Sequence, residues 1–149
     1  MKIAIGCDHG GFNLKGAVIK HLQEKNIEVK DFGTYSEESC DYPDFGVKVA
    51  EEVVQGNYDF GIVICGTGIG ISISANKVPG ARAALCHDTF SARSTREHNN
   101  ANILALGERV IGVGLALDIV DAFLNGNFQG GRHERRVSKI SEIEKKYFK

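Results

Sequence analysis

A thiol ends the most apolar segment of the chain, and three glycines follow it. That segment, FGIVIC over residues 60–65, ends at Cys65, and Gly66, Gly68 and Gly70 follow at alternate positions. Alternate glycines allow several backbone N–H groups to point at one anion, and such groups at the start of a helix favour the thiolate form of a cysteine. Cys65 could therefore act as a base or as a nucleophile. Two plainer interpretations remain open: a turn that binds no ligand, and a thiol that only fills the core.

The glycine-rich turn does not match the common nucleotide-binding motifs. The Gly-Lys-Ser/Thr of a phosphate loop is missing, and Gly70 comes one residue too early for Gly-x-Gly-x-x-Gly. Asp88, about 20 residues further on, is the one feature shared with dinucleotide-binding folds. The spacing alone therefore indicates an anion site of another kind, or a turn without a ligand.

Two histidines lie beside the ends of predicted strands. Asp8 and His9 directly follow the first strand, and His98 and Asn99 lead into the fifth. Because ligands of open α/β sheets bind at the carboxyl ends of the strands, we expect both histidines to gather with Asp8 beside Cys65 as an acid–base group. For either histidine alone, the capping of nearby backbone groups is the plainer interpretation.

A basic cluster lies close to the C-terminal end. Arg132 and Arg136 are four residues apart, so on a helix they share one face. Two guanidinium groups on one face suit a phosphate dianion. A solvent-exposed run of charges is the alternative. Nucleic acid is a weaker interpretation, because no aromatic residues are interleaved with the cluster.

The elements that must position these residues alternate along the chain. Short β-branched segments alternate with longer amphipathic ones, which predicts a doubly wound α/β fold with helices on both faces of a parallel sheet. The predicted strands are Lys2–Cys7, Ile27–Phe32, Phe60–Cys65, Ala81–Cys86 and Ile103–Leu106. The predicted helices are Asn13–Lys25, the segment between Pro43 and Gly56, the segment from Gly70 to about Lys77, Thr89–His98, Gly112–Leu124 and the charged tail from Arg132.

Composition excludes several classes of protein. With 149 residues, 42% hydrophobic and 25% charged, residues 1–149 are expected to form one globular domain. The formal net charge of −1 argues against general binding to nucleic acid or membranes. Apolar segments are too short to span a bilayer, and the N-terminus lacks a signal-peptide pattern. The four widely spaced cysteines are expected to be reduced thiols, which indicates a cytoplasmic protein.

Taken together, the motifs resemble those of type B ribose-5-phosphate isomerases. The resemblance runs in order from Met1 to about Ile143. It rests on Asp8–Gly11, Asp41–Asp44, Cys65–Gly70, His98–Asn102 and the pair Arg132 and Arg136. It implies a five-stranded Rossmann-like sheet, a homodimer that in some members pairs into a tetramer, and catalysis without a metal or an organic cofactor. The implied reaction interconverts ribose 5-phosphate and ribulose 5-phosphate through an enediolate.

The resemblance also implies roles for the residues of the site. Cys65 would be the base that moves a proton between C1 and C2, Thr67 would relay the hydroxyl proton, and Asp8 and His98 would open the sugar ring. A branch of the family uses a glutamate instead of the thiol, and Ile71 occupies that place here. The implied substrate-binding residues are His9, Tyr42, Gly66, Gly68, Ile69, Gly70, Asn99, Arg132 and Arg136.

Within this group, the glycines would donate N–H groups to the enediolate, and His9 would hold the phosphate together with the two arginines. Tyr42 and Asn99 would line the sugar site. The C-terminal helix has an apolar side at Ile140, Ile143 and Tyr147 with no following strand to bury it. We therefore expect this helix at a dimer interface. The resemblance implies the same assembly, with His98 and the arginines of one subunit serving the Cys65 site of its partner.

Three other functions compete with this interpretation. Sister enzymes act on allose 6-phosphate or galactose 6-phosphate, so the sugar is less well determined than the chemistry. A flavodoxin-like module that binds a ligand without catalysis would need neither Cys65 nor His98. A redox enzyme would use Cys65 as a nucleophile, but no second cysteine lies close to it in the sequence.

Overall fold

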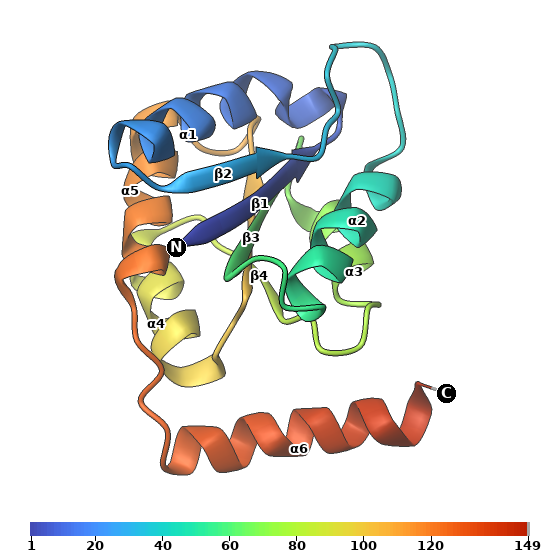
Figure 1. Ribbon diagram of the computed structural model, residues 1–149, viewed down its shortest axis with the longest axis vertical. Coiled ribbons are helices and arrows are strands. Elements are labelled where there is room, and N and C mark those ends of the chain that lie inside the picture. Colours follow the sequence, from blue (N-terminus) through green and yellow to red (C-terminus); the bar gives the residue numbers. More distant parts are fainter. Residues whose placement is uncertain (149) are drawn as a thin grey trace.

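Five parallel strands form the centre of the structure, a computed structural model that describes residues 1–148 (Figure 1). Along the sheet the strands lie in the order β2-β1-β3-β5-β4, and every neighbouring pair is parallel. The strands are β1 (Lys2–Cys7), β2 (Glu28–Asp31), β3 (Phe60–Cys65), β4 (Ala83–Leu85) and β5 (Ile103–Gly107). The helices are the 3₁₀ turn η1 (His9–Gly11), α1 (Phe12–Glu24), α2 (Tyr42–Val54), α3 (Ile69–Ala75), α4 (Thr89–Asn99), α5 (Val113–Asn125) and α6 (Arg132–Tyr147).

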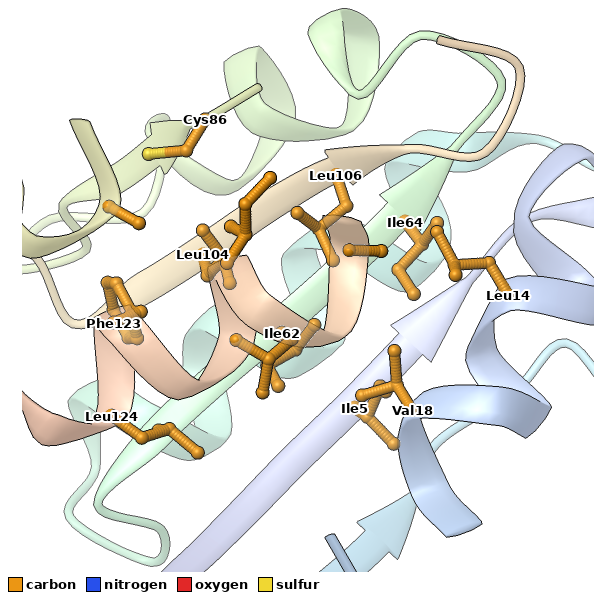
Figure 2. Packing of buried hydrophobic residues seen from close by; sticks show 14 of the residues in the cluster. Ile5, Leu14, Val18, Ile62, Ile64, Cys86, Leu104, Leu106, Phe123 and Leu124 are labelled. Carbon is orange, nitrogen blue, oxygen red and sulfur yellow. The ribbon is translucent and has the colours of Figure 1, made fainter. Parts of the chain in front are cut away.

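Both faces of the sheet are covered by helices, as the sequence predicts. Successive residues of a strand point to opposite faces, so each central strand supplies two separate cores. Ile62 and Leu104 pack with α1, α4 and α5 on one face, and Figure 2 shows this core with Phe123 of α5. Val63 and Cys65 pack with α2 and α3 on the other face. Because the central strands are buried on both sides, they carry continuous apolar sequence.

The two edge strands are short. β2 has four residues and is only half buried, which agrees with its predicted place near an edge. β4 is shorter than the predicted segment 81–86, because the backbone N–H of Arg82 donates to the side chain of Asn102 (2.7 Å) instead of a neighbouring strand. The side-chain amide of Asn76 bonds both the N–H (2.7 Å) and the C=O (2.9 Å) of Ala83 in β4.

Helix α6 stands apart from the layered body of the molecule. Figure 1 shows it on the side opposite to the arrowheads of β1 and β2, joined to α5 by an extended segment. The carboxylate of Glu144 accepts from the N–H of Gly80 (3.2 Å), and a cavity of about 440 Å³ lies between α6 and the β4 edge. Ile140 and Ile143 remain 46% and 57% exposed. Thus the apolar side of this helix is incompletely covered within one chain.

Candidate active site

Cys65 is the last residue of β3 and lies at the carboxyl edge of the sheet, where the strands end. Its side chain is only 4% exposed, and the backbone N–H of Gly68 donates to its Sγ atom at 3.1 Å. Gly68 has a φ of +78°, and a Cβ there would lie 2.5 Å from Leu85 Cδ1. Only glycine fits this left-handed and crowded position. The glycine therefore enables the turn that places an N–H donor on the thiol.

The rest of the turn carries a hydroxyl and packs against an aromatic ring. Thr67 Oγ1 accepts from the N–H of Ile69 (3.2 Å), the first residue of α3. A Cβ at Gly70 would lie 2.1 Å from the ring of Tyr42, so this ring packs directly on the glycine turn. Tyr42 begins α2, and the structure thereby brings two segments that are 28 positions apart against each other.

Asp8 and His9 extend the same edge from β1. The N–H of Asp8 donates to the carbonyl of Ile64 (3.2 Å), the residue of β3 that precedes Cys65, so Asp8 is held beside the end of that strand. Its Oδ1 accepts from the N–H of Gly10 (2.9 Å), and this cap starts η1. A cavity of about 550 Å³ is lined by Asp8, Cys40, Asp41, Tyr42, Pro43 and Asp44. Asp8 and Tyr42, two predicted site residues, therefore meet at one cavity.

His98 and Asn99 lie at the opposite side of the sheet, at the amino ends of the strands. They occupy the last turn of α4, which runs back from the carboxyl end of β4 to the start of β5. Three residues later, the carbonyl of Asn102 accepts from the N–H of Gly61, at the start of β3, whereas Cys65 ends that strand. The expectation that His98 gathers beside Cys65 of its own chain is therefore wrong. The physical reason is that a crossover helix runs antiparallel to the strands that it connects.

The basic cluster lies next to His98. The rings of His98 and His133 stack with centroids 4.3 Å apart and an angle of 10° between their planes. His133 is buried, and burial, followed by the charges of His98, Arg132 and Arg136, lowers its pKa. Arg132 and Arg136 share the first turns of α6 as predicted. His98, Asn99 and the two arginines thus form a second group, remote from Cys65.

Sequence reasoning missed two residues at the carboxyl edge. Arg109 follows β5, and its guanidinium lies against Gly66: a Cβ on that glycine would be 3.2 Å from Arg109 Nη1. Cys40 has its backbone N–H 3.2 Å from Nδ1 of His9 and its Sγ 3.9 Å from the same atom. For Arg109, its place just after a central strand was an available signal. For Cys40 there was none, because its partner lies 31 positions away.

The remaining cysteines are parts of the core. Burial raises the pKa of the Cys7 thiol to about 12 and that of Cys86 to about 11. Both side chains pack among the apolar residues between the sheet and the helices α1 and α5. They are therefore uncharged at neutral pH, as expected for thiols that only fill space.

The carboxyl edge combines the groups that proton transfer requires. It holds a thiol with an N–H donor, a hydroxyl, a carboxylate and a guanidinium within one group of loops. Among residues 1–148, no three His, Cys, Asp or Glu side chains are placed to hold a metal ion together. The same residues include no helix that is both long and apolar enough to cross a membrane. The fold and the site thus define an α/β protein that gathers acidic, basic and hydrogen-bonding groups at the carboxyl edge of its sheet.

Comparison with known proteins identifies the family. The family described as Ribose/Galactose Isomerase matches residues 3–140, and the chain belongs to it. Ribose-5-phosphate isomerase B of Escherichia coli (strain K12) is 52% identical over 145 residues, covering 97% of each chain.

Solved structures agree with the family and the fold. A ribose-5-phosphate isomerase B of Clostridium thermocellum is 66% identical, with a TM-score of 0.98 over 99% of both chains. The Mycoplasma genitalium enzyme with bound ribulose 5-phosphate is 44% identical, with a TM-score of 0.93 over 97% of this chain and 96% of that one.

Proposed function

We propose that this chain interconverts D-ribose 5-phosphate and D-ribulose 5-phosphate. One observation carries the proposal: the buried thiol of Cys65 accepts an N–H from Gly68 at 3.1 Å, inside a turn of glycines at the carboxyl edge of the sheet. A hydrogen bond from an amide stabilises the thiolate, which is the form that acts as a base. The relatives described above carry the same reaction in their names, which supports this choice of substrate.

The isomerisation moves one proton between two carbons. The thiolate of Cys65 takes the proton from C2 of the open aldose and returns it to C1, while Thr67 relays the hydroxyl proton from O2 to O1. Negative charge builds on oxygen in the enediolate, where the backbone N–H groups of Gly66 and Gly70 would stabilise it. The N–H of Gly68 donates to Cys65 Sγ and would turn to the enediolate only after the thiolate has taken up the proton. Loss of one such donor costs roughly 3–4 kcal/mol of transition-state stabilisation in comparable sites.

Ring opening comes before this proton transfer and needs an acid and a base. Asp8 lines the cavity and His98 lies on the second group, so the two act together only when groups from two chains meet. In the same arrangement His9, Arg132 and Arg136 hold the phosphate, and Tyr42 and Asn99 line the sugar site. Arg109 adds a positive charge beside Gly66, where the developing oxyanion would benefit from it.

The positions of the two groups support a homodimer. Cys65 lies at the carboxyl ends of the strands, whereas His98 and the arginines lie at the amino ends. A single chain therefore has both halves of a site but not beside each other. Pairing of two copies would join them, and the exposed Ile140 and Ile143 on α6 supply apolar surface for the contact. Two such dimers can pair further into a tetramer.

The test is a direct assay of the purified chain. Ribose 5-phosphate is added in the presence of EDTA, and the appearance of ketose is measured. Parallel reactions contain allose 6-phosphate and galactose 6-phosphate, again with ketose formation measured. A further reaction contains the ketose erythrulose 4-phosphate, and its conversion to the aldose is measured, because a relative 44% identical bears the name D-erythrulose-4-phosphate isomerase. A higher kcat/KM for one of these than for ribose 5-phosphate would replace the substrate and keep the chemistry. Failure with all four would refute the proposal.

A further inference from the structure

We infer that residues 33–41 form a positioning segment that holds His9 in the tautomer with its proton on Nε2. The inference starts from the contact between the backbone N–H of Cys40 and Nδ1 of His9, at 3.2 Å. A backbone N–H can only donate, so Nδ1 must present its lone pair to it. In a neutral imidazole the proton is then on the other nitrogen, because the hydrogen bond made by one nitrogen determines the state of the other.

The start of the segment is bonded to the strand that carries His9. The N–H of Cys7 donates to the carbonyl of Gly33, and the N–H of Thr34 donates to the carbonyl of Cys7, both at 2.6 Å. These two bonds join the segment to β1 two residues before His9. The Cys40 contact attaches the far end of the segment to His9 itself, so both ends of the segment are held.

A partly buried ion pair supports this attachment from α1. Lys15 is only 2% exposed, and its Nζ lies 2.8 Å from Asp31 Oδ1 and donates to the carbonyl of Thr34. The same oxygen of Asp31 accepts from the N–H of Gly33 (2.8 Å). Removal of Lys15 would leave the Asp31 carboxylate, whose side chain is 33% exposed, without its cation, and the carbonyl of Thr34 without this donor. Lys15 therefore fixes where the segment leaves β2, although it lies outside the catalytic group.

The consequence is a defined donor beside the cavity. Asp8, which precedes His9 in the chain, and Cys40, which contacts its ring, both line that cavity. With Nδ1 occupied, His9 presents Nε2–H, which donates to an anionic oxygen such as that of a phosphate. The opposite tautomer would present a lone pair at Nε2 and repel the same oxygen. This inference rests on the proposed function for the identity of the anion, but the tautomer itself does not depend on it.

The tautomer is measurable by NMR in the free protein. Two-bond ¹H–¹⁵N correlation spectra of protein with ¹⁵N-labelled histidine distinguish protonated from unprotonated ring nitrogens, and comparison with His9→Gln assigns the signals of His9. At pH values where the ring is neutral, we expect Nδ1 without a proton and Nε2 with one. The opposite tautomer, or an equal mixture of the two, would overturn the inference.

Three variants separate the backbone contact from the thiol. Cys40→Ala keeps the backbone N–H and should leave the His9 spectrum unchanged. Cys40→Pro removes the N–H and should give a mixture of tautomers, and Lys15→Met should do the same by releasing the segment. For both, KM for ribose 5-phosphate should rise about three- to tenfold, as for one lost hydrogen bond, with kcat changed less than about twofold.

An unchanged His9 spectrum in a folded Cys40→Pro protein would overturn the inference. If neither Cys40→Pro nor Lys15→Met folds, the wild-type spectrum still decides the tautomer. The expected tautomer in a chain that turns over no sugar phosphate would uphold the positioning role and refute the proposed function instead.

Discussion

Two inactive variants of this chain should restore activity to each other. Cys65→Ala removes the proposed base at the end of β3. His98→Ala removes the proposed ring-opening group at the end of α4, which lies at the amino ends of the strands. Each loss should lower turnover by at least ~10²-fold, the lower end for removal of an acid–base group. If a site takes Cys65 from one chain and His98 from the partner, a mixed dimer has one site with both defects and one intact site.

The expected recovery follows from this arrangement. After random exchange of equal amounts, about half of the dimers are mixed, and one of the two sites in each is intact, so about a quarter of wild-type activity should return. The assay is ketose formation from ribose 5-phosphate after incubation of the mixed proteins, with exchange verified by mass spectrometry of differently labelled chains. Mixing Cys65→Ala with Cys65→Ser is the matched control and should recover nothing. No recovery between Cys65→Ala and His98→Ala, despite verified exchange, would refute the shared site.

Three further predictions concern single side chains. Cys65→Ser keeps the shape but provides a far weaker acid, so kcat should fall at least ~10²-fold with little change in substrate binding; near wild-type turnover would refute the assignment of the base. Arg136→Ala should mainly raise KM for ribose 5-phosphate, by loss of a charge-assisted contact that contributes about 1.5–3 kcal/mol, whereas equal turnover of ribose and ribose 5-phosphate by the wild type would contradict the phosphate site. Burial raises the pKa of Cys7 to about 12 and that of Cys86 to about 11, so both thiols stay protonated as the pH approaches the ordinary pKa of 9.0. Iodoacetamide at pH 8 should therefore label neither cysteine before the protein is denatured. Peptide mapping that finds either cysteine labelled in the folded protein would contradict this.

The strands whose limits the sequence predicts correctly are those buried on both faces. β1 and β3 match their predicted limits, because an uninterrupted apolar segment is typical of the centre of a parallel sheet. At the edge this signal weakens. β4 is three residues shorter than predicted because the N–H of Arg82 bonds a side chain, and this competition is not visible in a pattern of apolar residues.

The candidate site was only partly accessible to sequence reasoning. Cys65 with its glycine turn could be located because the strand end and the motif are adjacent in the chain. The position of His98 could have been inferred too, since the last turn of a crossover helix lies at the amino ends of the strands. Placing the motif by its closeness in sequence to the fifth strand disregards the direction in which the helix runs. The contact of Cys40 with His9 depends on how a loop folds back over 31 positions, and no local pattern encodes it.

The two edge strands, β2 and β4, affect how readily copies of this chain could aggregate. An edge strand normally offers free N–H and C=O groups on which another chain can add a strand. At one end the side chain of Asn76 occupies both such groups of Ala83, and at the other end β2 is four residues long with the charged Glu28 and Lys30 exposed. Neither end is therefore a good template for a growing β-structure, and contacts between copies of this chain are left to its helical surfaces.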